Sequence, residues 1–189
     1  MGIVLASSSP RRQELLRMVG LDGFRVIPAQ SAEVAPPGLS PGLTVSGIAL
    51  QKAKNVSLFC DFDDIIIAAD TLVCLDGRLL GKPLGPEGAA AMLKELSGRK
   101  HTVFTGVAIQ KGGVSAVASE ATDVYFREIS DSEIAAYVAT GEPMDKAGAY
   151  GAQGRGAVFV ARIDGDFFNV MGLPLCRLSL MLREFGISI

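Results

Sequence analysis

The sequence contains no tryptophan, one histidine and only three cysteines among its 189 residues. Cys60, Cys74 and Cys176 are far apart and form no CxxC pair, and His101 alone cannot complete a zinc-ligand set. These absences exclude a zinc-binding module and a disulfide framework. They predict three reduced thiols in a cytoplasmic protein, since disulfides are rare in reducing compartments.

The sequence also lacks a charge excess and a long apolar run. It has 18 Lys and Arg against 20 Asp and Glu, a net charge of −2, and only three tyrosines to stack on bases. We therefore expect no nucleic-acid partner. The longest apolar run, residues 65–69, is far shorter than a membrane span, and the N-terminus lacks the basic start of a signal peptide. We therefore expect no membrane partner and a single globular domain over residues 1–189.

Apolar spacing predicts strands and helices that do not alternate strictly, which indicates an α/β fold with a mixed sheet and flanking helices. Strands are expected at residues 3–6, 24–29 and 64–70, around turns at Asp76-Gly77 and Gly112-Gly113, and, as strand, turn and strand, within 157–170. Helices are expected at residues 10–20, 44–59, 86–98, 129–141 and 173–186, the fourth with a capping box of Ser130 and Glu133. Three prolines and two glycines predict a loop at residues 32–43.

The segment SSSPRR, residues 7–12, separates a predicted strand from a predicted helix. Ser9 is a suitable N-cap, and Pro10 suits the first helical position. Arg11 and Arg12 are unusual there, because a helix N-terminus carries partial positive charge and prefers acidic residues. Backbone amides, hydroxyls and guanidinium groups together would bind an anion such as a phosphate. The alternative is a capped surface helix with solvated arginines.

Asp70 ends the predicted central strand, residues 64–70, and precedes Thr71. Because ligand sites of α/β sheets gather at strand ends, its carboxylate could hold a divalent metal or take a proton from water. Glu33, in the predicted loop, could supply a second metal ligand. The alternatives are a turn aspartate and an exposed loop glutamate.

Three lysines form a set with these groups: Lys52, Lys82 and Lys146. Each alone also fits a solvated surface side chain. His101 fits a strand-start histidine with one hydrogen bond better than a catalytic base. A fixed structural turn is expected at Asn169, Gly172 and Pro174.

Two glycine-containing stretches fail as nucleotide-binding loops. GRLLGKP, residues 77–83, has three residues rather than four between its glycines and a proline where a P-loop needs Ser or Thr. GAYGAQGRG, residues 148–156, does not fit GxGxxG after a strand. No GxSxG nucleophile elbow occurs, and one histidine leaves little room for a serine triad. The residues indicate instead a magnesium-dependent site for a phosphate ester.

Five segments extend this interpretation: LASSSPRRQELL, AADTLVCLDGRLLGKP, LSGRKHTVFTGVAI, DKAGAYGAQGRGAVFV and FFNVMGLP. Their order and spacing resemble the Maf family of nucleoside triphosphate pyrophosphatases, first labelled septum-formation inhibitors, over nearly the whole chain. The resemblance implies a two-lobed mixed sheet with flanking helices, similar to inosine triphosphate pyrophosphatases, with the active-site cleft between the lobes. It also implies hydrolysis of a nucleoside triphosphate to the monophosphate and pyrophosphate with a divalent metal, Mg or Mn.

The resemblance implies roles for single residues as well. Asp70 matches the catalytic acid-base aspartate, and Glu33 is expected beside it at the metal. The phosphate-binding turn is matched by Ser9, Arg11 and Arg12, and two motif lysines by Lys52 and Lys82. The positions associated with base choice are Arg12, Thr71 and Gln153.

Tyr150 and Gln153 match the subgroup of the family that acts on dTTP and UTP. Ala152 replaces an isoleucine common at that place, which could loosen the packing beside Gln153. The hypothesis is therefore hydrolysis of dTTP and UTP, with modified pyrimidine nucleotides as further substrates. The alternatives are the same reaction on 7-methyl-GTP and a nucleotide-binding regulator of cell division without relevant turnover. The family likeness is also compatible with a homodimer.

Overall fold

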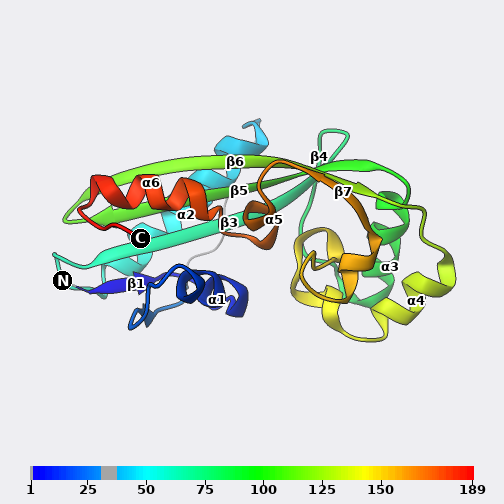
Figure 1. The fold of residues 1–189 in the computed structure, drawn as a ribbon, viewed down its shortest axis with the longest axis horizontal. Helices are drawn as coiled ribbons and strands as arrows, with labels where there is room; N and C mark the ends of the chain where they lie inside the picture. Colours follow the sequence, from blue (N-terminus) through cyan, green and yellow to red (C-terminus); the bar gives the residue numbers. More distant parts are fainter. Residues whose placement is uncertain (1, 31–37) are drawn as a thin grey trace. The chain divides into compact units, whose positions relative to one another are not determined.

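A seven-stranded mixed sheet has the strand order β2-β1-β3-β5-β6-β7, with β4 paired to β3 (Figure 1). The computed structural model describes residues 2–30 and 38–189. β1 pairs in parallel with β2 and β3, whereas β3–β4 and β6–β7 are antiparallel. The strands are β1 (Ile3–Leu5), β2 (Arg25–Val26), β3 (Ile65–Leu75), β4 (Arg78–Leu80), β5 (Lys100–Lys111), β6 (Val114–Phe126) and β7 (Val160–Asp164). The predicted α/β class with a mixed sheet is confirmed.

The helices flank this sheet, as the apolar spacing predicts. Within residues 2–30 and 38–189, the α-helices are α1 (Pro10–Met18), α2 (Pro41–Ser57), α3 (Gly85–Leu96), α4 (Asp131–Val138), α5 (Phe167–Met171) and α6 (Leu175–Glu184). The 3₁₀-helices in the same residues are η1 (Glu142–Asp145), η2 (Ala147–Ala149) and η3 (Arg155–Phe159). Within the part of the chain that the structure describes, no helix combines the length and the apolar character needed to cross a bilayer.

The chain folds into two compact units. The first comprises Met1–Asp70, Thr105–Glu120 and Gly172–Ile189, and the second comprises Thr71–Phe104 and Ala121–Met171. β3, β5 and β6 therefore contribute residues to both units.

One part of the core of the first unit consists of small side chains between α2 and the sheet. Residues of β1 and β3, and Ala6 just after β1, pack against α2 in a cluster of Val4, Ala6, Ala49, Ala53, Val56, Ile66, Ala68 and Ala108. Figure 1 shows α2 behind the strands and α6 in front of them. Gly106 of β5 permits the close approach of α2, because a Cβ at this position would lie 2.3 Å from the carbonyl carbon and oxygen of Val45. This packing fixes the helix that carries Lys52.

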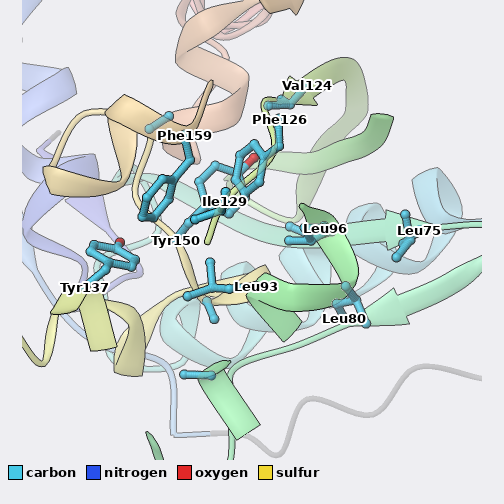
Figure 2. Close-up of a cluster of buried hydrophobic side chains, with 14 of the residues drawn as sticks. Leu75, Leu80, Leu93, Leu96, Val124, Phe126, Ile129, Tyr137, Tyr150 and Phe159 are labelled. Carbon is cyan, nitrogen blue, oxygen red and sulfur yellow. The ribbon is translucent and has the colours of Figure 1, made fainter. Parts of the chain in front are cut away.

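The core of the second unit contains several aromatic rings (Figure 2). Phe126 packs edge-on against Tyr150 with ring centroids 4.7 Å apart, and Tyr137 packs edge-on against Phe159 at 5.1 Å. Such edge-to-face pairs are stabilising beyond the apolar area that they bury. Leu93 and Leu96 supply the buried face of α3. This core holds the glycine-rich segment against α3 and α4.

Two local predictions are confirmed by the backbone. Asp76 and Gly77 have φ values of 50° and 80° and join β3 to β4, as expected for an Asp-Gly hairpin turn. Ser130 and Glu133 form both hydrogen bonds of the capping box that begins α4.

Two other predictions are wrong. α2 begins at Pro41 rather than Thr44, because Ser40 caps it by accepting a hydrogen bond from the Leu43 amide at 3.4 Å. The predicted strand after the turn at Gly165 is instead helix α5, because the Asp166 carboxylate accepts the Phe168 amide at 2.7 Å. The rest of the loop predicted at residues 32–43 lies largely outside the described residues.

Candidate active site

The first element of the site is an ion pair between Lys52 of α2 and Asp70 of β3. Lys52 Nζ lies 2.6 Å from Asp70 Oδ1, and the two side chains are only 12% and 9% exposed. Ile48 and Val56, which are both buried, lie one helical turn before and after Lys52. The helix therefore places this lysine on its apolar face, toward the strands.

The placement of Asp70 corrects the prediction that it ends a strand. It lies inside β3, which runs on to Leu75. The parallel pairing of β1 with β3 stops at Leu5 and Ile67, whereas pairing with β4 begins only at Val73. The strand continues because its apolar residues extend as far as the hairpin turn. Asp70 therefore lies beyond the point where β1 stops pairing with β3. It lies within a strand, which is rigid, rather than in a turn.

The second element is the SSSPRR segment. Arg12 donates from Nε to the Gly172 carbonyl at 2.8 Å and from Nη1 to Ser7 Oγ at 3.1 Å. Ser9 is the N-cap of α1 by position, but its hydroxyl makes no capping hydrogen bond to the described part of the helix; its amide donates to Ser7 Oγ at 3.2 Å. Arg11 is partly buried in the same first turn. The guanidinium of Arg12 is therefore held in a defined orientation.

Ser7 and Gly172 both accept hydrogen bonds from Arg12, and the sequence analysis did not single out either for the candidate site. Ser7 is buried, at 8% exposure, and joins Arg12 to the start of α1. A signal for Ser7 was present, because three consecutive serines precede the arginines. Gly172 was assigned only a structural turn, and nothing local in the sequence links its carbonyl to an arginine 160 residues earlier.

The remaining predicted site residues belong to the second unit, apart from Glu33, which lies outside the described residues. Thr71 is partly buried in β3, whereas Lys82 and Gln153 are exposed. The amide of Gly148 donates to the Gly81 carbonyl at 3.1 Å, which joins the glycine-rich segment to the chain next to Lys82. Within the second unit, these two segments are thus tied by their backbones.

Lys146 differs from a solvated surface lysine. Its side chain is 12% exposed, and Nζ donates to the Glu142 carbonyl at 2.6 Å and to Asp145 Oδ1 at 2.7 Å. Lys146 therefore stabilises the fold of the glycine-rich segment.

His101 is a structural residue, as expected. It is 2% exposed, and its Nε2 lies 2.9 Å from the Tyr150 hydroxyl. Burial lowers the pKa of His101 to about 4, so the imidazole is neutral at neutral pH. Asn169 is also structural, because its buried amide donates to the Val103 carbonyl at 3.0 Å and to Thr122 Oγ1 at 2.9 Å.

The described residues contain no group of three or more His, Cys, Asp or Glu side chains that could enclose a metal ion. Of the carboxylates predicted to hold the metal, Asp70 is the one that lies among the described residues.

Comparisons with known proteins identify relatives over almost the whole chain. The family model described as Maf-like protein matches residues 2–185. The chain is 49% identical to the dTTP/UTP pyrophosphatase of Pelotomaculum thermopropionicum, over 99% of this chain and 98% of that protein. It is 50% identical to the dTTP/UTP pyrophosphatase of Moorella thermoacetica, over 99% and 96% of the two chains.

A solved structure is similar in fold. The HAM1 protein from Coxiella burnetii covers 97% of this chain and 99% of its own, with a TM-score of 0.50 and 15% sequence identity. At this identity the likeness concerns the fold alone. The family match, by contrast, extends over almost every residue, including SSSPRR, Lys52 and Asp70. On that evidence, the chain belongs to the Maf-like protein family.

Proposed function

We propose that this chain hydrolyses nucleoside triphosphates, dTTP and UTP first, to the monophosphate and pyrophosphate. The observation that carries the proposal is the shielded pair of Lys52 and Asp70, 2.6 Å apart. The pair supports the proposal because a carboxylate and a cation lie together, and the family resemblance implies roles for both residues. Full-length relatives named dTTP/UTP pyrophosphatase support the substrate class.

In this reaction a water oxygen forms a bond to the α-phosphorus, and the bond from that phosphorus to the bridging oxygen breaks. The pyrophosphate leaves with the electron pair, and the water proton passes to the Asp70 carboxylate. Lys52 holds that carboxylate in position through its short contact at Oδ1. Because β3 is a rigid strand, the carboxylate needs little reorganisation before it accepts the proton.

The phosphate chain requires fixed positive charge as the leaving group develops. Arg12 is oriented by Ser7 and Gly172 at the start of α1, where helix amides already favour an anion. We assign Ser9 and Arg11 to the same phosphate-binding turn, and Lys82 to the pyrophosphate. An anion of this kind explains why α1 begins with two arginines and no acidic residue in its first turn.

A divalent metal fits the donor chemistry of the site. Mg²⁺ and Mn²⁺ prefer carboxylate and phosphate oxygens, and Mg²⁺ is commonly held by one or two carboxylates together with substrate phosphates. Asp70 would supply one such oxygen, and Glu33 is proposed as the second. When bound, the metal would neutralise charge on the triphosphate.

The base is assigned to Gln153, Thr71 and Arg12. A glutamine amide can donate and accept at once, which suits a pyrimidine edge that presents a carbonyl and an N–H. Gln153 is exposed, while Ala152 beside it is buried at 8% exposure. We further propose that residues 1–189 act as one functional domain in the cytoplasm. None of the three cysteines forms a disulfide, which is consistent with that location.

The test is pyrophosphate release from a panel of dTTP, UTP, 7-methyl-GTP and purine triphosphates, with Mg²⁺ or Mn²⁺. We expect dTTP and UTP to be preferred and Asp70→Asn to lower kcat by at least about 100-fold, the usual contribution of a general base. Asp63→Asn, the same change at an exposed side chain near the start of β3, is the matched control. Full activity of Asp70→Asn would refute the mechanism. Tight binding without turnover by the wild type would instead support a nucleotide-binding regulator.

A further inference from the structure

The carboxylate of Glu142 lies at the centre of the glycine-rich segment. Oε1 accepts the Tyr137 hydroxyl at 2.9 Å and the Gly156 amide at 3.3 Å, and Oε2 accepts the Arg155 amide at 3.0 Å. Three donors thus converge on one side chain. The carboxylate occupies the position that an external anion would take in a loop of backbone amides.

The glycines of this segment explain how the chain approaches so closely. A Cβ at Gly154 would lie 2.3 Å from Glu142 Oε1, and one at Gly156 would lie 2.8 Å from the Tyr137 hydroxyl oxygen. A Cβ at Gly151 would lie 2.8 Å from Lys146 Cε. Any larger residue would displace the side chains around which the segment folds. The glycines therefore allow the backbone to approach the Glu142 carboxylate and the side chains around it.

Tyr137 connects this carboxylate to the other end of the turn. Its hydroxyl accepts the Gly151 amide at 3.1 Å while it donates to Glu142. Burial raises the pKa of Tyr137, so the hydroxyl keeps the proton that it donates. Burial alone would raise the pKa of Glu142, but hydrogen bonds from the Arg155 amide and the Tyr137 hydroxyl hold it below its ordinary value. The acceptor therefore stays ionised at neutral pH.

Gln153 lies inside the turn that these groups hold. The Gly154 amide donates to the Gly151 carbonyl at 3.2 Å and closes the turn around Gln153. Residue 151 is fixed by Tyr137, and residues 155 and 156 are fixed by Glu142. The backbone on both sides of Gln153 is thus tied to one hydrogen-bond network around Glu142 and Tyr137.

We propose that Glu142 is a positioning residue that sets base preference, because its carboxylate fixes the turn that presents Gln153 to the nucleotide base. This inference rests on the proposed function of Gln153. Glu142 need not touch the substrate, since it acts through the amides of residues 155 and 156 and through Tyr137. Glu142→Gln keeps the size of the side chain but turns an NH₂ group toward donors, which leaves at least one amide without its acceptor.

The experiment compares kcat/KM for dTTP and for a purine triphosphate in the full-length protein. The base preference is the kcat/KM for dTTP divided by the kcat/KM for the purine triphosphate. Glu142→Gln should lower this ratio about fivefold to tenfold, which is the effect of weakening one neutral hydrogen bond to the base. Amide hydrogen exchange should accelerate at residues 151–156. Glu128→Gln, the same change at an exposed glutamate of the second unit, should leave the ratio and the exchange rates as in the wild type.

A double-mutant cycle identifies the route of the effect. If Glu142 acts through Gln153, adding Glu142→Gln to Gln153→Ala should change the ratio by less than about twofold. Additive losses would overturn the proposal, as would a folded Glu142→Gln protein with the wild-type ratio.

If Glu142→Gln does not fold, Tyr137→Phe decides, because it keeps the ring against Phe159 and removes only the hydroxyl (Figure 2). Its ratio should fall in the same direction, and an unchanged ratio would overturn the proposal. The wild-type panel and Asp70→Asn test hydrolysis separately. Failure of the proposed function would appear there, in the wild type, whereas failure of this inference would appear only in the variants.

Discussion

We predict that His101 makes the free energy of unfolding depend on pH, in a pH range where few other groups titrate. The imidazole is buried and packs edge-on against the rings of Phe126 and Tyr150, at centroid distances of 4.9 and 5.4 Å. Its Nδ1 has no hydrogen-bond partner among the described residues, so a proton placed there would have no acceptor. Burial therefore lowers the pKa of His101 from 6.5 to about 4, although the charge of Asp123 opposes this effect.

The sign follows from proton linkage. The folded state holds His101 neutral down to a pH of about 4, whereas the unfolded chain protonates it below about 6.5. The contribution to stability is complete above pH 6.5 and is lost progressively as the pH falls toward 4. A pKa difference of about 2.5 corresponds to roughly 3 kcal/mol in total, of which about 2 kcal/mol is lost by pH 5.

The assay is urea unfolding at pH 7.5 and pH 5.0 for the wild type and His101→Gln. Glutamine can still hydrogen-bond to the Tyr150 hydroxyl but does not titrate. Between the two pH values, the wild type should lose about 2 kcal/mol more of its free energy of unfolding than the variant. Carboxylates titrate in both proteins, so their effect cancels in the difference. Equal losses in the two proteins would refute the reasoning, because His101 would then not be held neutral by the fold.

Three further substitutions test the close approach of α2 to β5 and the hydrogen bond accepted by Asp64. Gly106→Ala should lower stability by about 3 kcal/mol in thermal or urea unfolding, because its Cβ would meet the Val45 backbone at 2.3 Å. Gly47→Ala in α2 is its control, since a Cβ there meets nothing within 4 Å, and it should raise stability by about 0.5–1 kcal/mol. Asp64→Ala should destabilise by about 2 kcal/mol in the same assay, because it removes the buried acceptor of the Gly2 amide at 2.7 Å. Wild-type stability in Gly106→Ala or Asp64→Ala would contradict these assignments.

The elements that the sequence predicted correctly are those set by neighbouring residues. Asp76 and Gly77 favour a tight turn whatever surrounds them, and Ser130 and Glu133 complete a capping box within four residues. α5 has one local signal, the Asp166 carboxylate that accepts the Phe168 amide, but the sequence analysis did not use it. Its residues have strand propensity, but burial of Asn169 and its hydrogen bonds to distant atoms of β5 and β6 favour the helix.

The candidate site could be predicted as a set of residue types but not as a geometry. Lys52 and Asp70 were each proposed from their own segment, and only the fold brings them to 2.6 Å. A signal for Lys52 was nevertheless available. It lies on the apolar face of its helix, one turn from Ile48 and from Val56, where a surface lysine would not be placed. A charged residue on the apolar face of a helix indicates an oppositely charged partner on the element that packs against that face.

The glycine-rich segment shows why composition alone misleads about nucleotide loops. A loop that cradles phosphate and a loop that wraps a carboxylate need the same properties, namely close backbone approach and converging amides. In this chain the anion is Glu142, whose oxygens accept the amides of Arg155 and Gly156. The failure of this segment to match GxGxxG is then expected, because its spacing is set by an internal side chain rather than by a pyrophosphate. What such a loop can offer a substrate is the residue that it displays, and we propose that this residue is Gln153, which is exposed.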